Sequence, residues 1–137
     1  MAKRVLAVDD EKSSHVITDL IFPAPKDCTF EEHDIITRKR KAFEAGMVLV
    51  KTIEKCLIQL KESGPWDILC LDYDLGDRNA TEITDYLEKN TDQLPNEVYI
   101  VSFNPPGRKQ LAEALEDYFG MRKEWGEVIY LFGKVED

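Results

Sequence analysis

Two short apolar runs of the sequence, 4–8 and 67–71, each lead directly into acidic residues. Asp9 and Asp10 follow the first run, and Asp72 follows the second. If the runs are neighbouring strands, their carboxylates meet at one sheet edge and raise one another's pKa unless a cation lies among them. Oxygen ligands without His or Cys favour a hard ion, Mg²⁺ or Mn²⁺. The predicted metal ligands are Asp9, Asp10, Asp72 and Asp74. The alternative for the acidic residues that follow the first run, Asp9 and Asp10, is that they cap the next helix and stabilise its positive end.

A hydroxyl and an ammonium group follow two later apolar runs and suit the oxygens of a phosphoryl group. Ser102 and Lys134 are these donors. A carboxylate held by a metal can attack phosphorus to give an acyl phosphate, and Asp72 is the candidate nucleophile. Arg108 opens a helix beside backbone N–H groups, which suits a phosphate clamp. The candidate catalytic residues are Asp72, Asp74, Ser102, Arg108 and Lys134, and the candidate ligand contacts are Asn104 and Gly107.

The proposed site needs parallel strands that end at a common edge. Apolar runs typical of buried strands occupy 4–8, 47–50, 67–71, 98–101 and 128–132. Helical patterns follow Ser13, Thr52 and Asn79, and a fourth runs from Pro105 to Gly120. This alternation predicts right-handed crossovers. We expect an α/β fold with a doubly wound five-stranded parallel sheet in the flavodoxin-like order 2-1-3-4-5, in which ligands bind at the carboxyl ends of the strands.

Residues 23–46 do not fit this alternation. They combine prolines, a possible strand around Ile35 and Ile36, and a basic run at 38–41. We interpret them as an insertion between the first helix and the second strand of a single domain, 1–137. The basic run could contact a nucleotide, RNA or an acidic partner, although such a run is more often a solvated face.

Composition narrows the function further. The formal charge of −9 argues against general nucleic-acid binding and is compatible with a local cation site. No apolar stretch approaches the roughly 20 residues of a membrane span, and the start of the chain does not resemble a signal peptide. We therefore expect a cytoplasmic protein that does not bind membranes. Its three cysteines match no paired metal-ligand spacing and are expected to be reduced.

The arrangement resembles the receiver domains of response regulators. Val8-Asp9-Asp10-Glu11 matches their acidic metal-binding strand end, and Leu71-Asp72 matches their phosphoacceptor position. The resemblance implies that Ser102 is the switch hydroxyl and Lys134 the site lysine. Gly76 stands where receivers usually have proline, and Lys134 falls one residue late. LDYDLGD at 71–77 and SFNPPGR at 102–108 are more similar to the cyclic-phosphate processing receiver domains, whose usual pattern has His at the position of Tyr73.

Three functions remain open from the sequence. The first is signalling, in which Asp72 accepts a phosphoryl group with Mg²⁺ and Ser102 changes a surface that contacts an unknown protein partner. The second is metal-dependent hydrolysis of cyclic or terminal phosphates on nucleotides or RNA, with Arg108 as the clamp. The third is a receiver fold that only binds other proteins. The expected small-molecule partner is a phosphodonor or a phosphate-bearing nucleotide.

Overall fold

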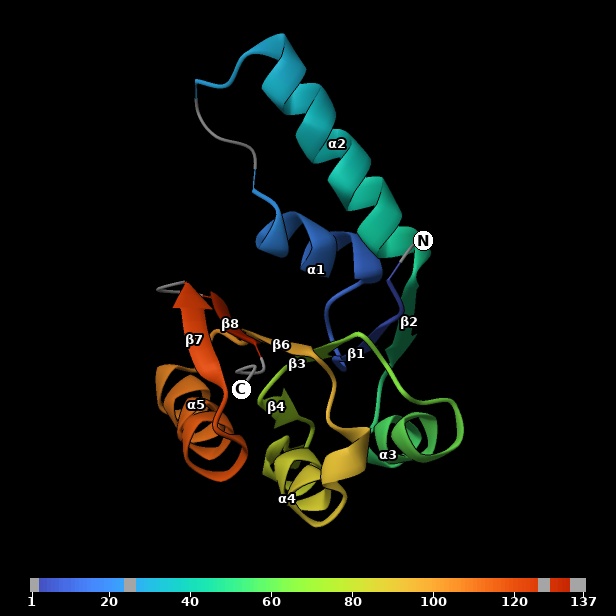
Figure 1. Cartoon of the computed structure of the whole chain (residues 1–137), viewed down its shortest axis with the longest axis vertical. Coiled ribbons are helices and arrows are strands. Elements are labelled where there is room, and N and C mark those ends of the chain that lie inside the picture. Colours follow the sequence, from blue (N-terminus) through green and yellow to red (C-terminus); the bar gives the residue numbers. More distant parts are fainter. Residues whose placement is uncertain (1–2, 24–26, 126–128, 134–137) are drawn as a thin grey trace.

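A six-stranded sheet forms the centre of the computed structural model, which describes residues 3–23, 27–125 and 129–133 (Figure 1). Its strands are β1 (Val5–Val8), β2 (Met47–Val50), β3 (Ile68–Leu71), β6 (Glu97–Val101), β7 (Arg122–Trp125) and β8 (Ile129–Gly133). Their order is β2-β1-β3-β6-β8-β7, and the first four run parallel. A separate antiparallel ribbon follows β3 and consists of β4 (Asp74–Leu75) and β5 (Arg78–Asn79).

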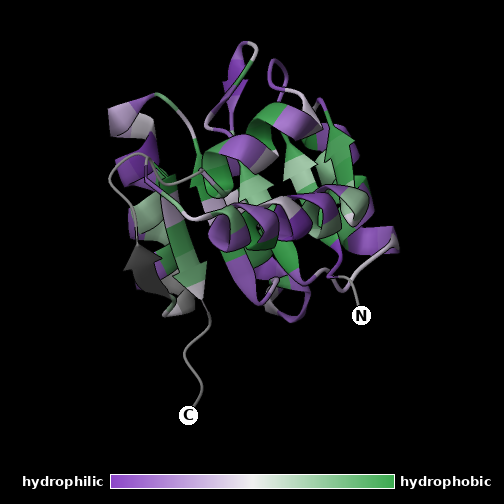
Figure 2. Ribbon diagram, turned by 90° about the horizontal axis from the view of Figure 1, so that it is seen from above, coloured by the Kyte–Doolittle hydropathy of each residue, from purple (hydrophilic) through white to green (hydrophobic). Residues whose placement is uncertain are grey.

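Helices lie on both sides of this sheet (Figure 1). They are α1 (Ser14–Ile21) and α2 (Phe30–Ala45) on one side, and α3 (Ile53–Glu62), α4 (Thr81–Lys89) and α5 (Pro105–Phe119) on the other. Successive side chains of a strand point to opposite faces. Leu6 and Val8 therefore pack in the cluster with α3, α4 and α5, whereas Val5 and Ala7 pack in the cluster with α1. β1, β2 and β3 accordingly consist of hydrophobic residues, and the central strands are mostly green in Figure 2. The predicted doubly wound α/β fold is confirmed.

The last predicted strand corrects the expectation of an all-parallel sheet. β8 lies beside β6, as the predicted order requires, but runs antiparallel to it, with Val98 opposite Phe132. The crossover through α5 leads instead to β7, which has the direction of β6 and pairs with the far side of β8. The sequence of β7, RKEW, is charged, as is common in edge strands. β7 therefore lacks the apolar run by which the other strands were predicted.

The segment treated as an insertion is mostly helical. α2 spans sixteen residues, so the strand considered around Ile35 and Ile36 is wrong. Thr29 and Glu32 form a capping box at its start, with Thr29 Oγ1 accepting from Glu32 N at 3.1 Å. Only Phe43 of this helix is buried, so the sequence lacks the broad apolar stripe by which surface helices are recognised.

β1, β3 and β6 run parallel, and all three end at the same edge of the sheet. Val8 pairs with Leu71, and Leu71 pairs with Ile100, so the residues that follow these strands emerge side by side. No helix in the described part of the chain is long and apolar enough to cross a membrane.

Candidate functional site

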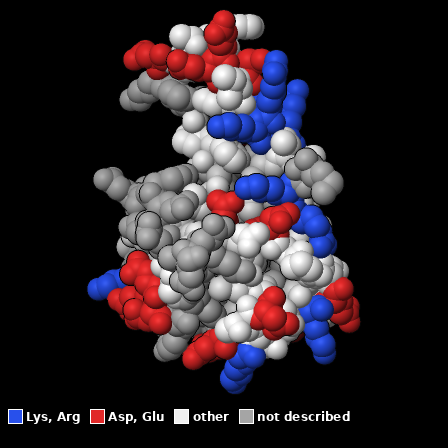
Figure 3. Space-filling model, viewed as in Figure 1, with Lys and Arg blue, Asp and Glu red and all other residues white. Residues whose placement is uncertain are grey.

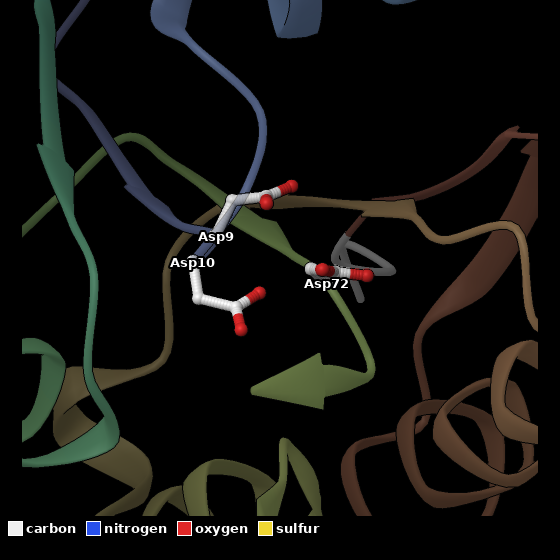
Figure 4. Close-up of side chains that lie close together, drawn as sticks. All are labelled: Asp9, Asp10 and Asp72. Atoms are coloured by element: carbon white, nitrogen blue, oxygen red, sulfur yellow. The ribbon is translucent and has the colours of Figure 1, made fainter. Parts of the chain in front are cut away.

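Three carboxylates meet at the edge where β1 and β3 end. One oxygen each of Asp9, Asp10 and Asp72 lie within 4.8 Å of one another (Figure 4). The register of β1 and β3 brings them together, and Asp72 N donates to the Val8 carbonyl at 3.2 Å. Asp9 and Asp72 are almost fully buried, at 1% and 7% exposure, while Asp10 is more open. The predicted clustering of these three residues is therefore present.

Lys12 supplies a positive charge that the sequence interpretation missed. Its Nζ lies 3.2 Å from Asp9 Oδ2 and 3.9 Å from Asp72 Oδ2, and its side chain is only 13% exposed. Asp9 Oδ1 holds the loop in place by accepting from the backbone N–H groups of Glu11 and Lys12 at 2.9 and 2.8 Å. Because Asp9 captures both the backbone and the side chain of Lys12, the lysine is fixed beside the carboxylates. The only sequence signal was its position three residues after Asp9.

The surroundings of Asp72 make its ionised form costly. Burial raises the pKa of Asp72 to about 6, and the negative charges of Asp9 and, to a smaller extent, Asp10 act in the same direction. Lys12 and a hydrogen bond from Ser102 lower this pKa and offset part of the effect. A further cation among the carboxylates would favour the ionised form of Asp72 and complete the compensation.

Ser102 and Asn104 connect the end of β6 to the carboxylates. Ser102 is 3% exposed, and its hydroxyl lies close enough to Asp72 to lower the pKa of that carboxyl. Its Oγ also accepts from Asn104 N at 3.3 Å. Asn104 caps α5, since its Oδ1 accepts from Gly107 N at 3.1 Å, and its Nδ2 donates to Asp74 Oδ2 at 3.2 Å. One short segment therefore positions a hydroxyl at Asp72 and begins a helix.

Asp74, predicted as a fourth metal ligand, lies in the exposed first strand of the β4-β5 ribbon and outside the group of three carboxylates. It ties that ribbon to Asn104. Asp10 ties it on the other side, because Asp10 Oδ2 accepts from Gly76 N at 3.0 Å. Gly76 has a φ of 74°, a backbone conformation that suits glycine. The second aspartate of the LDYDLGD segment thus connects two loops across the site.

Gly107 and Arg108 lie beside the site and do not line its hollow. A Cβ added to Gly107 would fall 2.3 Å from Tyr73 Cγ, so glycine allows the Tyr73 ring to pack against the start of α5. Arg108 Nη1 donates to the Ser102 carbonyl at 2.7 Å, and its guanidinium lies 5.8 Å from the centre of the Tyr130 ring. Arg108 Nε is buried without a hydrogen-bond partner among the described residues. In this structure Arg108 supports the backbone of Ser102.

Lys134, the predicted site lysine, lies outside the described residues. Gly133, the last residue of β8, pairs with Glu97 at the start of β6. Because β8 is antiparallel, its end lies at the edge of the sheet opposite the carboxylates. Lys12 is thus the lysine that the described structure places in the site.

An open hollow of about 340 Å³ lies over these groups. It is lined by Asp10, Glu11, Lys12, Asp72, Asp74, Gly76, Ser102, Phe103 and Asn104. Phe103 is 64% exposed, and Lys12 Nζ lies 4.9 Å from the centre of its ring. The hollow therefore combines acidic oxygens, one cation, one hydroxyl and one aromatic face, a combination that suits a metal-bound phosphate carrying an apolar group.

Replacing Asp72 by Asn should change how stability depends on pH in metal-free protein. The raised pKa means that folded Asp72 keeps its proton at a pH where the unfolded chain has lost it. The ionised Asp72 carboxylate destabilises the folded protein, and this effect is absent below about pH 4, grows towards about pH 6 and is complete above that. Asp72→Asn should therefore be more stable than the parent by on the order of 2 to 3 kcal/mol at neutral pH, with little difference at about pH 4. Urea unfolding across this range measures the effect.

Asp74→Asn is the matched control, since it removes one carboxylate from the exposed ribbon. Because Asp74 is exposed, its replacement should not reproduce the gain in stability that is expected of Asp72→Asn at neutral pH. If the difference in unfolding free energy between Asp72→Asn and the parent did not change with pH, the surroundings of Asp72 would not destabilise its ionised form.

Gly107→Ala should destabilise the protein by roughly 1 to 3 kcal/mol, because the new methyl group overlaps the Tyr73 ring. In a Tyr73→Ala background the same change should stabilise, since Ala exceeds Gly in helix propensity by about 1 kcal/mol. A double-mutant cycle from denaturant unfolding measures the coupling. Equal effects of Gly107→Ala in both backgrounds would contradict the packing contact.

A family model described as "Cyclic-phosphate processing Receiver domain" matches residues 5–117. No curated protein and no solved structure matches the chain. The matched range contains the three carboxylates, Lys12, Ser102 and Asn104, and ends before β7 and β8, where the sheet departs from the expected parallel arrangement. The resemblance inferred from the sequence is thus confirmed. The chain belongs to the family of cyclic-phosphate processing receiver domains.

Proposed function

We propose that this receiver domain binds Mg²⁺ or Mn²⁺ at Asp9, Asp10 and Asp72 and accepts a phosphoryl group on Asp72. The observation that carries the proposal is the convergence of the three carboxylates, two of them buried, within 4.8 Å. All donors are oxygens, as a hard divalent cation requires. Asp10 and Asp72 are the main ligands. Both oxygens of Asp9 already accept hydrogen bonds from the loop and from Lys12, so Asp9 contributes chiefly negative charge.

The bound ion would neutralise the phosphate of the donor and orient it towards Asp72. A carboxylate oxygen of Asp72 then forms a bond to phosphorus, while the bond from phosphorus to the leaving oxygen of the donor breaks and that oxygen takes the electron pair. Lys12 and the Ser102 hydroxyl lie next to Asp72 and provide hydrogen-bond donors for the phosphoryl oxygens. Arg108 keeps Ser102 in place through its carbonyl.

Acetyl phosphate and Mg²⁺ should add one phosphoryl group to the parent protein, detected by intact-protein mass spectrometry. Asp72→Ala should abolish the adduct, while Asp74→Ala, which alters the same loop outside the carboxylate group, should retain it. Lys12→Met should slow the reaction by about 10- to 100-fold, the cost of one charge-assisted contact of about 1.5 to 3 kcal/mol. An adduct that forms without a divalent cation, or that persists in Asp72→Ala, would refute the assignment.

A second function, hydrolysis of a cyclic phosphate, is favoured by Phe103. Acceptance of a phosphoryl group from a small donor does not need an exposed aromatic ring at the rim of the hollow. A phosphate attached to a nucleoside would use one, because a base can stack on the ring beside the phosphate site. Water would form the new bond to phosphorus and give one proton to a carboxylate. The bond from phosphorus to one ribose oxygen breaks, and that oxygen takes the electron pair and the proton that the carboxylate then releases. The description of the family supports the same substrate class.

If this second function holds, Phe103→Ala should raise the KM for a 2′,3′-cyclic nucleotide by about 5- to 100-fold, the value of one base stack of about 1 to 3 kcal/mol. Phe103→Trp should restore the KM, since it keeps an aromatic face. Phosphorylation by acetyl phosphate should be nearly equal in all three proteins. Absence of turnover by the Mg²⁺-loaded parent would eliminate the hydrolytic function and leave phosphoryl acceptance.

A further inference from the structure

Helix α2 extends beyond the rest of the fold, with its C-terminal end next to β2 and its N-terminal end free (Figure 1). Phe43, near the C-terminal end, is its only buried residue and packs edge-on against Phe22 and Tyr99. Phe30 at the free end is 89% exposed, and Ile35 is 52% exposed. The sixteen-residue helix therefore presents a long face that the described part of the chain does not cover.

The basic run at 38–41 divides between two sides of α2. Arg40 is turned towards α1, because its Nε donates to the Phe22 carbonyl at 2.7 Å and lies 3.7 Å from Asp19. Lys39 lines a hollow beside Phe43 and the sheet. Arg38 and Lys41 are exposed, and their spacing of three residues places them together on the outer face. Only these two basic residues are available to another molecule on that face.

The outer face carries an ordered stripe of charge. Residues three and four apart lie on the same side of a helix. The stripe consists of Glu31, Asp34, Arg38, Lys41 and Ala45, all of them exposed. Its first two members are acidic, and the next two are basic. Acidic side chains accordingly gather at the free N-terminal end of α2, and basic ones lie below them (Figure 3).

We propose that the outer face of α2 binds α2 of a second copy of this chain, with the two helices antiparallel. Reversing the stripe about Ile36 places Glu31 opposite Lys41 and Asp34 opposite Arg38. A twofold axis makes each of these pairs twice, which is the self-complementarity that a symmetric dimer requires.

Pairing within one helix accounts for only half of the stripe. Arg38 Nη2 contacts Asp34 Oδ2 at 2.7 Å, an ordinary pair four residues apart. Glu31 and Lys41 have no ion pair among the described residues, and ten positions of one helix keep them too far apart to meet. In the antiparallel dimer both gain a partner. Because these pairs are exposed, each contributes little, and the dimer should be weak and sensitive to salt.

Sedimentation velocity tests the proposal with the whole chain at concentrations up to about 1 mM and low ionic strength, where exposed charges are least screened. The parent should form a reversible dimer that dissociates as salt is added. Glu31→Lys with Asp34→Lys makes the stripe basic, and Arg38→Glu with Lys41→Glu makes it acidic. Each double variant alone should raise the dissociation constant at least about tenfold. An equimolar mixture of the two should form a heterodimer.

Lys55→Glu with Lys61→Glu is the matched control, since it changes the net charge as the acidic-stripe variant does but on the exposed side of α3. It should dimerise like the parent. Circular dichroism verifies that α2 remains helical, and recovery on mixing excludes simple unfolding. A parent that stays monomeric at low ionic strength would overturn the proposal. So would a dimer that the stripe variants do not weaken, or variants that do not associate when mixed.

Discussion

The mutual repulsion of three carboxylates at the end of two buried strands is the constraint on which the candidate site depends. Because Val8 and Leu71 are paired, the chain places Asp9 and Asp72 side by side where water is scarce. Burial in the first place, and repulsion by Asp9 and Asp10 in the second, raise the pKa of Asp72. Lys12 and Ser102 reduce this rise but do not remove it. A fold that places acidic groups in this way is well suited to a divalent cation and to the phosphate that the cation attracts.

The loops around the carboxylates are joined to one another as well as to the sheet. Asp10 holds Gly76, and Asp74 holds Asn104, so the β4-β5 ribbon is linked both to the end of β1 and to the start of α5. Asn104 in turn contacts Ser102, whose hydroxyl lies on Asp72. A change of charge at Asp72 would therefore act on the segment that begins α5. This connection is common to phosphoryl acceptance and hydrolysis, since either reaction alters the charge at the same carboxylate.

The sequence predicted the parts of the structure that depend on buried apolar runs. The runs that became β1 and β3, and the carboxylates that follow them, were identifiable because a buried parallel strand has a distinctive composition. The directions in which individual side chains point could not be predicted from the sequence. Lys12 turns into the site because Asp9 captures it, and Arg108 turns away because the Ser102 carbonyl accepts its Nη1. α2 was missed because tertiary burial reaches only Phe43, although the capping box at Thr29 was present in the sequence.

The most direct test of the central claim is the titration of the Asp72 carboxyl carbon by ¹³C NMR, from about pH 4 to about pH 8, with and without Mg²⁺. We expect the pKa of Asp72 to lie near 6 in metal-free protein and to fall when Mg²⁺ is added, because the cation stabilises the ionised carboxylate. A pKa that is ordinary in metal-free protein and does not respond to Mg²⁺ would contradict both the strained carboxylate cluster and the metal site.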